Sequence, residues 1–230
     1  MPDPDTKWIS ALGALADLYA DADRLGDRLR ALHGARLHCE RGCHACCVDG
    51  VTVFAVEAEN IRRYLAKWLV KATPHPEGGC AFLDAAGACR IYRHRPYVCR
   101  TQGLPLRWIE GRPDGEAVEL RDICPLNEAG DPVETLPPDT CWTIGPFEGR
   151  LAALQATLDG GTLRRVPLRS LFRRGFPSNA TPWRGILLAC TGTATARDFP
   201  CALRRGVEGN AGSNALRAMR RSVTGAAHTP

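Results

Sequence analysis

The sequence predicts a small, irregular, cysteine-rich α+β domain over residues 5–159, with short strands and flanking helices around a metal centre. A disordered basic tail is expected over residues 160–230. Three observations support this prediction. Helical periodicity appears near both ends of the first region, β-branched runs lie between them, and nine of the chain's 11 cysteines fall there. A bound ion can replace part of the apolar core that such a domain lacks.

The cysteine count and the first residues favour a reducing compartment. Eleven is an odd number, so complete internal disulfide pairing is impossible. The acidic start, residues 1–7, lacks the basic lead and apolar run of a secretory signal, and no apolar segment approaches the ~20 residues that span a membrane. We therefore expect a cytoplasmic protein without membrane contact, where cysteine clusters bind metal more often than they form disulfides.

Amphipathic helices are expected at three places. From Thr6 to Leu32, apolar residues recur every three or four positions, with most aspartates and arginines off this stripe. Residues 57–71 and 146–158 show the same pattern, and the Gly160-Gly161 pair ends the last helix. We assign the first helix to support of the fold and not to chemistry.

Extended segments are expected between these helices. The run 51–56 is β-branched and aromatic, which is typical of a buried strand. Residues 101–110 and 116–121 predict two further extended segments, because the intervening Gly-Arg-Pro-Asp-Gly is rich in turn formers.

A β-hairpin is expected in the second cysteine region. Residues 80–83 and 88–91 flank a four-residue loop, Asp-Ala-Ala-Gly, so that Phe82 would face Cys89. Side chains alternate along a strand, and Cys80 would therefore project from the same face as Cys89. The hairpin would bring these two thiols to one centre.

The chain's charge is distributed unevenly. Residues 1–159 carry a formal charge of −5, whereas residues 160–230 hold 12 arginines, no lysine and only two acids, Asp198 and Glu208, for a charge of +10. The basic region has no sustained apolar period, so we expect disorder. Weak contacts with nucleic acid are the functional alternative for this tail, but no aromatic-interleaved module or zinc finger supports nucleic acid as a partner.

The run Cys39-Glu-Arg-Gly-Cys43-His-Ala-Cys46-Cys47 places four thiols in nine residues. Two residues separate Cys43 from Cys46, and this spacing lets both sulfurs face one ion. Because neighbouring side chains diverge, the adjacent Cys46 and Cys47 suit two metal ions or one larger cluster. The run therefore predicts a zinc or iron–sulfur site.

Eight cysteines are candidate metal ligands: Cys39, Cys43, Cys46, Cys47, Cys80, Cys89, Cys99 and Cys124. They can furnish two four-ligand sites, or one site with spare, redox-active thiols. Pro96 predicts a short helix that places Cys99 in its first turn, where the helix dipole favours thiolate. For Arg95 and Arg100, which bracket Cys99, support of the thiolates and simple solvation are equally weighted. We expect histidines to support the site rather than bind metal, and Cys141 to be a small buried apolar residue.

At these residues the chain resembles the YkgJ-like cysteine-cluster family, whose hallmark is a C-x-x-C-x-x-C-C run. The second block of that family stands here as Cys80-Ala-Phe-Leu-Asp84, Cys89-Arg-Ile-Tyr92 and Arg95-Pro96-Tyr-Val-Cys99-Arg100. One departure is the three residues, instead of two, between Cys39 and Cys43. The resemblance implies a zinc- or iron-chelating domain; the family includes iron–sulfur proteins, and a related motif occurs in flagellin lysine methylases.

The predicted function is binding of zinc or an iron–sulfur cluster through cysteine thiolates, with a redox or metal-handling role. Two alternatives remain. One is a protein-modifying, methyltransferase-like enzyme with an auxiliary iron–sulfur cluster, although no G-x-G-x-x-G follows any expected strand. The other is an interaction module that zinc staples together. A metal ion is the expected partner, no protein partner is identified, and we expect metal binding to be coupled to folding.

Overall fold

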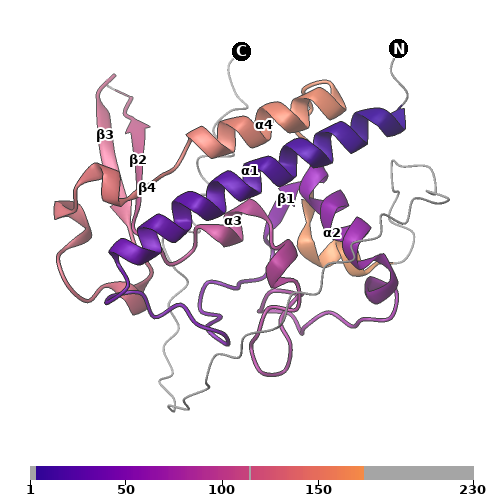
Figure 1. Ribbon diagram of the computed structural model, residues 1–230, viewed down its shortest axis with the longest axis horizontal. Helices are drawn as coiled ribbons and strands as arrows, with labels where there is room; N and C mark the ends of the chain where they lie inside the picture. The colour runs from indigo at the N-terminus through magenta and orange to yellow at the C-terminus, as the bar shows by residue number, and fades with distance from the viewer. Residues whose placement is uncertain (1–3, 114, 174–230) are drawn as a thin grey trace.

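The computed structural model describes residues 4–113 and 115–173. Figure 1 shows the long helix α1 (Pro4–Leu32) crossing the molecule beside α4 (Pro146–Asp159). Helix α2 (Ala55–Leu69) lies at one end, and strands β2 (Leu106–Gly111), β3 (Ala117–Asp122) and β4 (Trp142–Thr143) lie at the other. Loops that carry the cysteines lie below α1 in this view. The mixture of helices with short strands confirms the expected α+β class.

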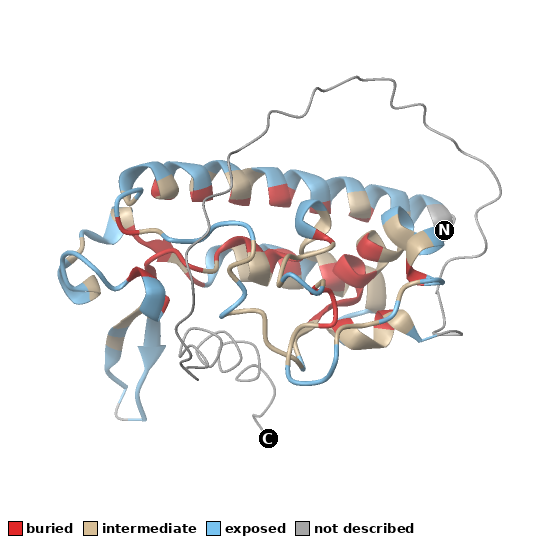
Figure 2. Cartoon of the chain, turned by 90° about the horizontal axis from the view of Figure 1, so that it is seen from below, coloured by how far each residue is buried: buried red, intermediate tan, exposed pale blue. Residues whose placement is uncertain are grey.

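Helix α1 forms because its apolar stripe has a face of the core to cover. Leu15, Tyr19, Ala22 and Leu29 lie on this stripe and are buried, and Figure 2 shows the buried positions along one side of the helix only. Leu32, the last residue of the expected stripe, is 62% exposed. The predicted helix is confirmed.

Strand β1 (Thr52–Phe54) is shorter than the run 51–56 predicts, because α2 begins at Ala55. Two backbone N–H groups at the start of α2 find acceptors outside the helix. The Ala55 N–H donates to the Arg164 carbonyl (3.0 Å), and the Val56 N–H donates to Oε1 of the buried Gln155 (2.9 Å). The first backbone N–H groups of a helix have no acceptor within the helix, and these two partners supply one for each.

The ordered fold continues past the boundary that we set at residue 159. Strand β5 (Arg165–Pro167) pairs antiparallel with β1, with Val53 opposite Val166, and a 3₁₀ turn (Leu168–Phe172) follows. Val166 and Leu171 are buried in a second apolar cluster with α2. The disorder that we expected from residue 160 is therefore wrong for residues 160–173; residues 174–230 lie outside the described part.

A three-stranded sheet stands at the other end of α1. Its strands β2 (Leu106–Gly111), β3 (Ala117–Asp122) and β4 (Trp142–Thr143) have the order β3-β2-β4. Strand β3 confirms the expected segment 116–121, and β2 confirms the second half of the expected segment 101–110, whose residues 101–104 form turns instead. Helix α4 ends as expected, because Gly160 adopts the left-handed conformation (φ 67°) that glycine tolerates best.

The predicted hairpin over residues 80–91 is wrong in register. A single antiparallel bridge joins Leu83 to Cys89, where we expected Phe82 opposite Cys89. The Asp84 carboxylate accepts hydrogen bonds from the N–H groups of Ala86 (2.9 Å) and Ala88 (2.8 Å). These hydrogen bonds close a turn over residues 84–88, which is one residue longer than predicted. The residues on either side of the turn form no regular strand.

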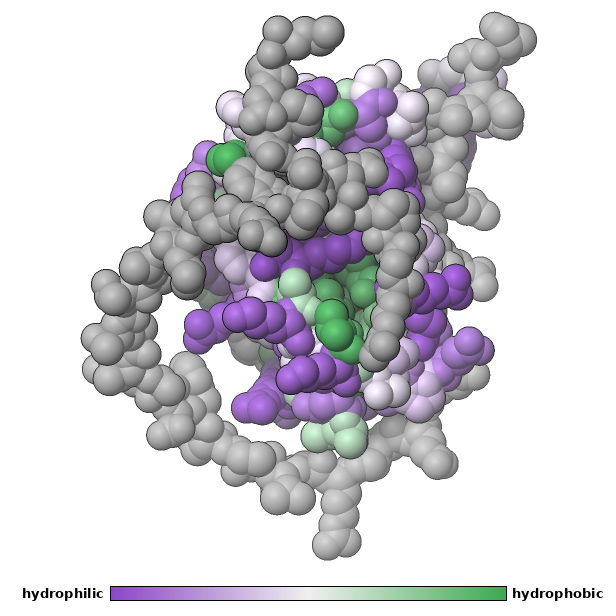
Figure 3. Space-filling view, turned by 90° about the vertical axis from the view of Figure 1, so that its right-hand side faces the viewer, coloured by the Kyte–Doolittle hydropathy of each residue, from purple (hydrophilic) through white to green (hydrophobic). Residues whose placement is uncertain are grey.

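Apolar residues form two buried clusters, one under α1 and α4 and one between α2 and the β1–β5 pair. On the face seen in Figure 3, hydrophobic residues gather in the middle, and hydrophilic residues surround them. Among residues 4–113 and 115–173, no helix combines the length and apolar character that crossing a lipid bilayer requires.

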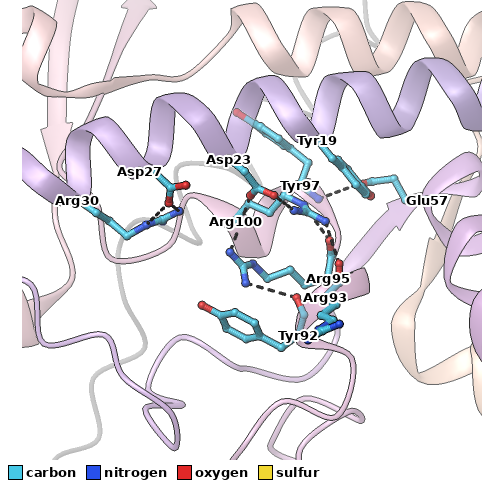
Figure 4. Close-up of polar contacts among 10 residues, drawn as sticks. All are labelled: Tyr19, Asp23, Asp27, Arg30, Glu57, Tyr92, Arg93, Arg95, Tyr97 and Arg100. Carbon is cyan, nitrogen blue, oxygen red and sulfur yellow. Dashed lines mark hydrogen bonds and ion pairs between the residues drawn. The ribbon is translucent and has the colours of Figure 1, made fainter. Parts of the chain in front are cut away.

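Glu57 is a buried carboxyl group that joins α1, α2 and the short helix α3 (Tyr97–Arg100). Its Oε1 accepts hydrogen bonds from the Tyr19 hydroxyl (2.9 Å) and the Tyr97 N–H (2.8 Å), and its Oε2 accepts one from the Phe54 N–H (3.2 Å). Figure 4 shows Glu57 beside both tyrosines. Burial raises the pKa of Glu57, while these donors partly offset the increase.

We predict that Glu57→Gln lowers the free energy of unfolding by about 1–3 kcal/mol, because the new amide NH₂ meets a buried N–H donor in place of an acceptor. Urea unfolding measures this loss. The exposed Glu110→Gln is the control and changes stability by less than ~0.5 kcal/mol. Equal effects of both changes would contradict the assigned role.

Candidate metal centre

The eight candidate thiols come from four separate pieces of the chain. The loop between α1 and β1 carries Cys39, Cys43, Cys46 and Cys47; the segment after α2 carries Cys80 and Cys89; α3 carries Cys99; and Cys124 precedes a 3₁₀ turn at Pro125–Asn127. All nine described cysteines are free thiols.

The first cysteine loop is folded by two tight turns. The Cys43 N–H donates to the Glu40 carbonyl (3.0 Å), and the Cys47 N–H donates to the His44 carbonyl (2.8 Å). Nδ1 of His44 hydrogen bonds to the Gly42 carbonyl at 2.8 Å. A Cβ atom on Gly87 would lie 2.6 Å from this nitrogen, so the two cysteine loops approach closely only because residue 87 is glycine.

Backbone pairing joins the first loop to the second. The Cys80 N–H donates to the Cys47 carbonyl (2.9 Å), and an antiparallel bridge links Val48 to Gly79. These bonds hold Cys47 and Cys80 next to each other in space although 33 positions separate them in the sequence. The chain therefore brings two thiol-bearing segments together before any side chain is considered.

Arg169 fastens this junction from the turn after β5. Its guanidinium pairs with Asp49 (2.6 Å) and donates to the carbonyls of His75 (2.6 Å), Pro76 (3.2 Å) and Gly79 (2.9 Å). We did not expect a positioning residue here, because we assigned residue 169 to the disordered tail. A basic residue in a charge-rich segment offers no sequence signal for a partner 90 to 120 residues away.

Arg90 fastens the second loop in a similar way. It donates to the carbonyls of Thr73 (2.9 Å) and Ala81 (2.9 Å) and lies over the Trp68 ring, 5.0 Å from its centroid. A planar guanidinium can satisfy several carbonyls at once. The arginine therefore fixes the backbone on both sides of Cys80.

The Cys39 side chain packs against Asn127 and Gly103, which belong to two other loops. The side chain of Asn127, which is fully buried, donates from Nδ2 to the Cys39 sulfur (3.3 Å) and to the Gly103 carbonyl (2.8 Å), and accepts the His38 N–H at Oδ1 (2.8 Å). A Cβ atom on Gly103 would overlap the Cys39 sulfur. The missing side chain of Gly103 thus leaves the space that this sulfur fills.

Hydrogen bonds pair the thiols of the first loop. The bond from Cys43 lowers the pKa of Cys39 to about 6, against burial, and Asn127 lowers it further. The same shared proton raises the pKa of Cys43. Cys46 and Cys47 form a second such pair, in which the bond lowers the pKa of Cys46 and raises that of Cys47. Each pair therefore favours one thiolate, the form that binds metal.

Cys99 lies where the loops meet. Burial raises the pKa of its thiol, and the nearby charges of Cys80, Cys89 and Cys46 raise it further. Burial also raises the pKa of Cys124, to which Cys39 and Cys46 add. Each of the eight candidate sulfurs is thus near at least one other in the set, whereas Cys141 lies apart and receives a hydrogen bond from Arg121 (3.7 Å).

The donor set fits a thiophilic metal by its chemistry, because thiolates prefer zinc and iron–sulfur clusters. In the described part of the chain, no three His, Cys, Asp or Glu side chains lie close enough together to hold one ion in their present positions. The thiols of Cys39 and Cys43, and those of Cys46 and Cys47, shift each other's pKa as pairs. The eight candidate sulfurs share one region of the fold without forming a closed coordination shell.

The arginines near the thiols differ in what they do. Burial raises the pKa of Cys89, while the positive charges of Arg95 and Arg90 lower it. Arg100 instead points to α1, where its Nη1 pairs with Asp23 at 2.5 Å. Arg95 and Arg100 lie on either side of Cys99 in the sequence. By these contacts, Arg95 lowers the pKa of a thiol, whereas Arg100 pairs with a carboxylate.

The fold and the cysteine arrangement define a small α+β protein with a thiol-rich, potential metal-binding centre. Residues 38–125 match the model of the CxxCxxCC family, described as "Putative zinc- or iron-chelating domain". The resemblance expected from the cysteine spacing is confirmed over this segment, and the match supports binding of zinc or iron there. No curated protein and no solved structure matches the chain.

We predict that Arg169→Gln lowers the free energy of unfolding by about 2–3 kcal/mol, because an aspartate and three carbonyls lose a charged donor. Chemical denaturation measures the loss. Arg173→Gln removes the same charge from an exposed position four residues on and changes stability by less than ~0.5 kcal/mol. If both variants unfold at the same denaturant concentration, Arg169 does not fasten the loops.

Gly103→Ala is expected to displace the Cys39 sulfur and to weaken metal binding at that thiol. Gly130→Ala is a matched control, because both glycines have positive φ (88° and 99°) while a Cβ on Gly130 meets nothing within 4 Å. Both changes cost about 1 kcal/mol of backbone strain. Metal titration of the reduced proteins separates them; unchanged metal affinity in Gly103→Ala would remove Cys39 from the ligand set.

Proposed function

We propose that this chain binds zinc or an iron–sulfur cluster through the thiolates of Cys39, Cys43, Cys46, Cys47, Cys80, Cys89, Cys99 and Cys124. The main support for this proposal is the group of thiols around Cys99. The half-buried Cys99 thiol has a pKa that the charges of Cys80, Cys89 and Cys46 raise, and these three cysteines come from two other segments of the chain. Ordinary core packing does not require four thiols from distant segments in one region.

Two neighbouring groups of sulfurs can be distinguished. Cys80, Cys89 and Cys99 influence one another together with Cys46 and Cys47, which makes five thiols, enough for the four ligands that a tetrahedral zinc ion or a cubane cluster needs. Cys39, Cys43 and Cys124 form the second group. Cys46 links the two groups, because its charge raises the pKa of both Cys99 and Cys124.

The scaffold suits metal handling or redox chemistry rather than a static zinc staple alone. Thiols with lowered pKa lie in the first loop, and Cys39 is exposed. An accessible thiolate can receive a metal ion or exchange electrons, which a fully enclosed structural site does not allow. Thiolates persist under reducing conditions, so we place the protein in the cytoplasm.

The first test is anaerobic purification with elemental analysis and a visible spectrum. We expect a stoichiometric metal, either iron with a broad brown absorption or zinc without colour. Cys99→Ala should lose at least half of the bound metal, because its thiol interacts with those of Cys46, Cys80 and Cys89 in the first group. The control Cys141→Ala, outside both groups, should keep all of it.

Two results would overturn the proposal. One is a reduced, anaerobically prepared protein without stoichiometric zinc or iron. The other is equal metal content in Cys99→Ala and Cys141→Ala. Circular dichroism of each variant establishes that metal loss does not follow from unfolding, and Cys89→Ala repeats the test if Cys99→Ala does not fold.

A further inference from the structure

A cleft rich in arginine opens beside the thiol centre, between α1 and residues 92–100. It consists of two adjoining hollows, with volumes of about 400 Å³ and 220 Å³. Arg30, Tyr92, Arg95 and Arg100 line both hollows, and the smaller hollow reaches the sulfur-bearing residues Cys39 and Cys99. Together they are large enough for a small molecule.

The cleft carries more positive than negative side chains. Four arginines (Arg30, Arg93, Arg95 and Arg100) and two aspartates (Asp23 and Asp27) line the larger hollow. Figure 4 shows Asp23 and Asp27 on α1, with Arg30 beside Asp27 and with Arg95 and Arg100 beside Asp23. With all six ionised, a formal charge of +2 remains, and this charge favours an anionic ligand.

The aspartates are already engaged. Asp23 pairs with Arg100 at 2.5 Å, and Asp27 pairs with Arg30 at 3.0 Å, one turn along the same helix. Arg93, whose side chain is exposed, forms no ion pair with any described residue. The surplus charge of the cleft therefore resides mainly on Arg93 and Arg95.

Arg95 is held in place yet incompletely bonded. Its side chain is only 11% exposed, it lies over the Tyr92 ring at 3.9 Å from the centroid, and its nearest carboxylate oxygen is 4.0 Å away, on Asp23. Nε of Arg95 is buried and has no hydrogen-bond partner among the described residues. An unpaired buried guanidinium N–H is costly. Nη1 makes one long hydrogen bond to the Tyr92 carbonyl (3.4 Å), so the terminal nitrogens keep donors that an oxyanion in the cleft would accept.

Arg100 makes the cleft rigid before a ligand arrives. Its side chain is 6% exposed, and it donates from Nε to the Arg95 carbonyl (3.1 Å) and from Nη2 to the Arg93 carbonyl (3.4 Å). Its guanidinium also lies 4.0 Å from the centroid of the Tyr19 ring. Arg100 thus positions the backbone of the two arginines with surplus charge, which lowers the entropic cost of binding.

We propose that this cleft binds a small molecule through a phosphate or carboxylate group, with the oxyanion held by Arg95 and Arg93. The planar guanidinium of Arg95, fixed by Tyr92, matches the paired oxygens that both groups present. The remainder of the ligand extends into the smaller hollow toward Cys39 and Cys99. This binding does not require that the thiols hold a metal.

Isothermal titration of the full chain with inorganic phosphate and with malonate, at constant ionic strength set by chloride, tests the proposal. We expect saturable binding of at least one probe, and the stronger probe identifies the group that the cleft prefers. Arg95→Gln should weaken binding at least tenfold, and Arg95→Lys should recover only part of it, since it restores the charge without the planar fork. Arg150→Gln, which removes the same charge from a partly exposed pair with Asp21, should change affinity less than twofold.

Absence of saturable binding of either probe at millimolar concentration would overturn the proposal, as would equal weakening by Arg95→Gln and Arg150→Gln. If Arg95→Gln does not fold by circular dichroism, the exposed Arg93→Gln takes its place with the same expected weakening. The metal content of each preparation is measured in parallel. A protein without metal that still binds the anion contradicts only the metal-binding function.

Discussion

The structure depends on one constraint: the two cysteine loops must lie edge to edge. The hydrogen bond from the Cys80 N–H to the Cys47 carbonyl and the bridge between Val48 and Gly79 establish this arrangement. A short pairing of this kind is weak alone. It persists here because Arg169 bonds to both sides of the junction and because β5, which precedes that arginine, is paired with β1.

Charge explains why so many arginines surround the thiols without binding them. Several thiolates in one partly buried region repel one another, and at Cys99 this repulsion adds to the larger effect of burial in raising the pKa. At Cys89, where burial raises the pKa, the positive charges of Arg95 and Arg90 lower it. Other arginines, such as Arg169, act on the backbone and set where the sulfurs stand. Some arginines therefore offset the negative charge of the thiolates, and others hold the backbone that places the sulfurs.

The segment from Tyr92 to Arg100 connects the thiol region with the arginine cleft. Cys99 interacts with the thiols of Cys80, Cys89 and Cys46 and also lines the smaller hollow of the cleft, together with Arg95 and Arg100. Arg100 joins both to α1 through Asp23. A ligand held by this segment would therefore lie against the thiols, and the same four-residue helix would position the metal site and its neighbour.

The sequence by itself determined the elements whose cause is local. Helices α1 and α4 follow from an apolar period of three to four residues, and Gly160 ends α4 because of its own conformational freedom. The cysteine spacing also identified the type of domain, which the family match over residues 38–125 confirms. The eight ligands remain a proposal that motif spacing suggested and the fold groups in space.

Only the tertiary structure decided the features that depend on distant partners. Strand β5 is three residues long and has no period of its own, and its partner β1 lies more than 100 positions earlier. The hairpin register shifted because one side chain, Asp84, closed the turn. Arg169, Asn127 and Gly103 gained their roles from carbonyls and a sulfur that other loops bring to them. Hydrogen bonds and steric fit act over a few ångströms of space, and a linear pattern does not record which residues come that close.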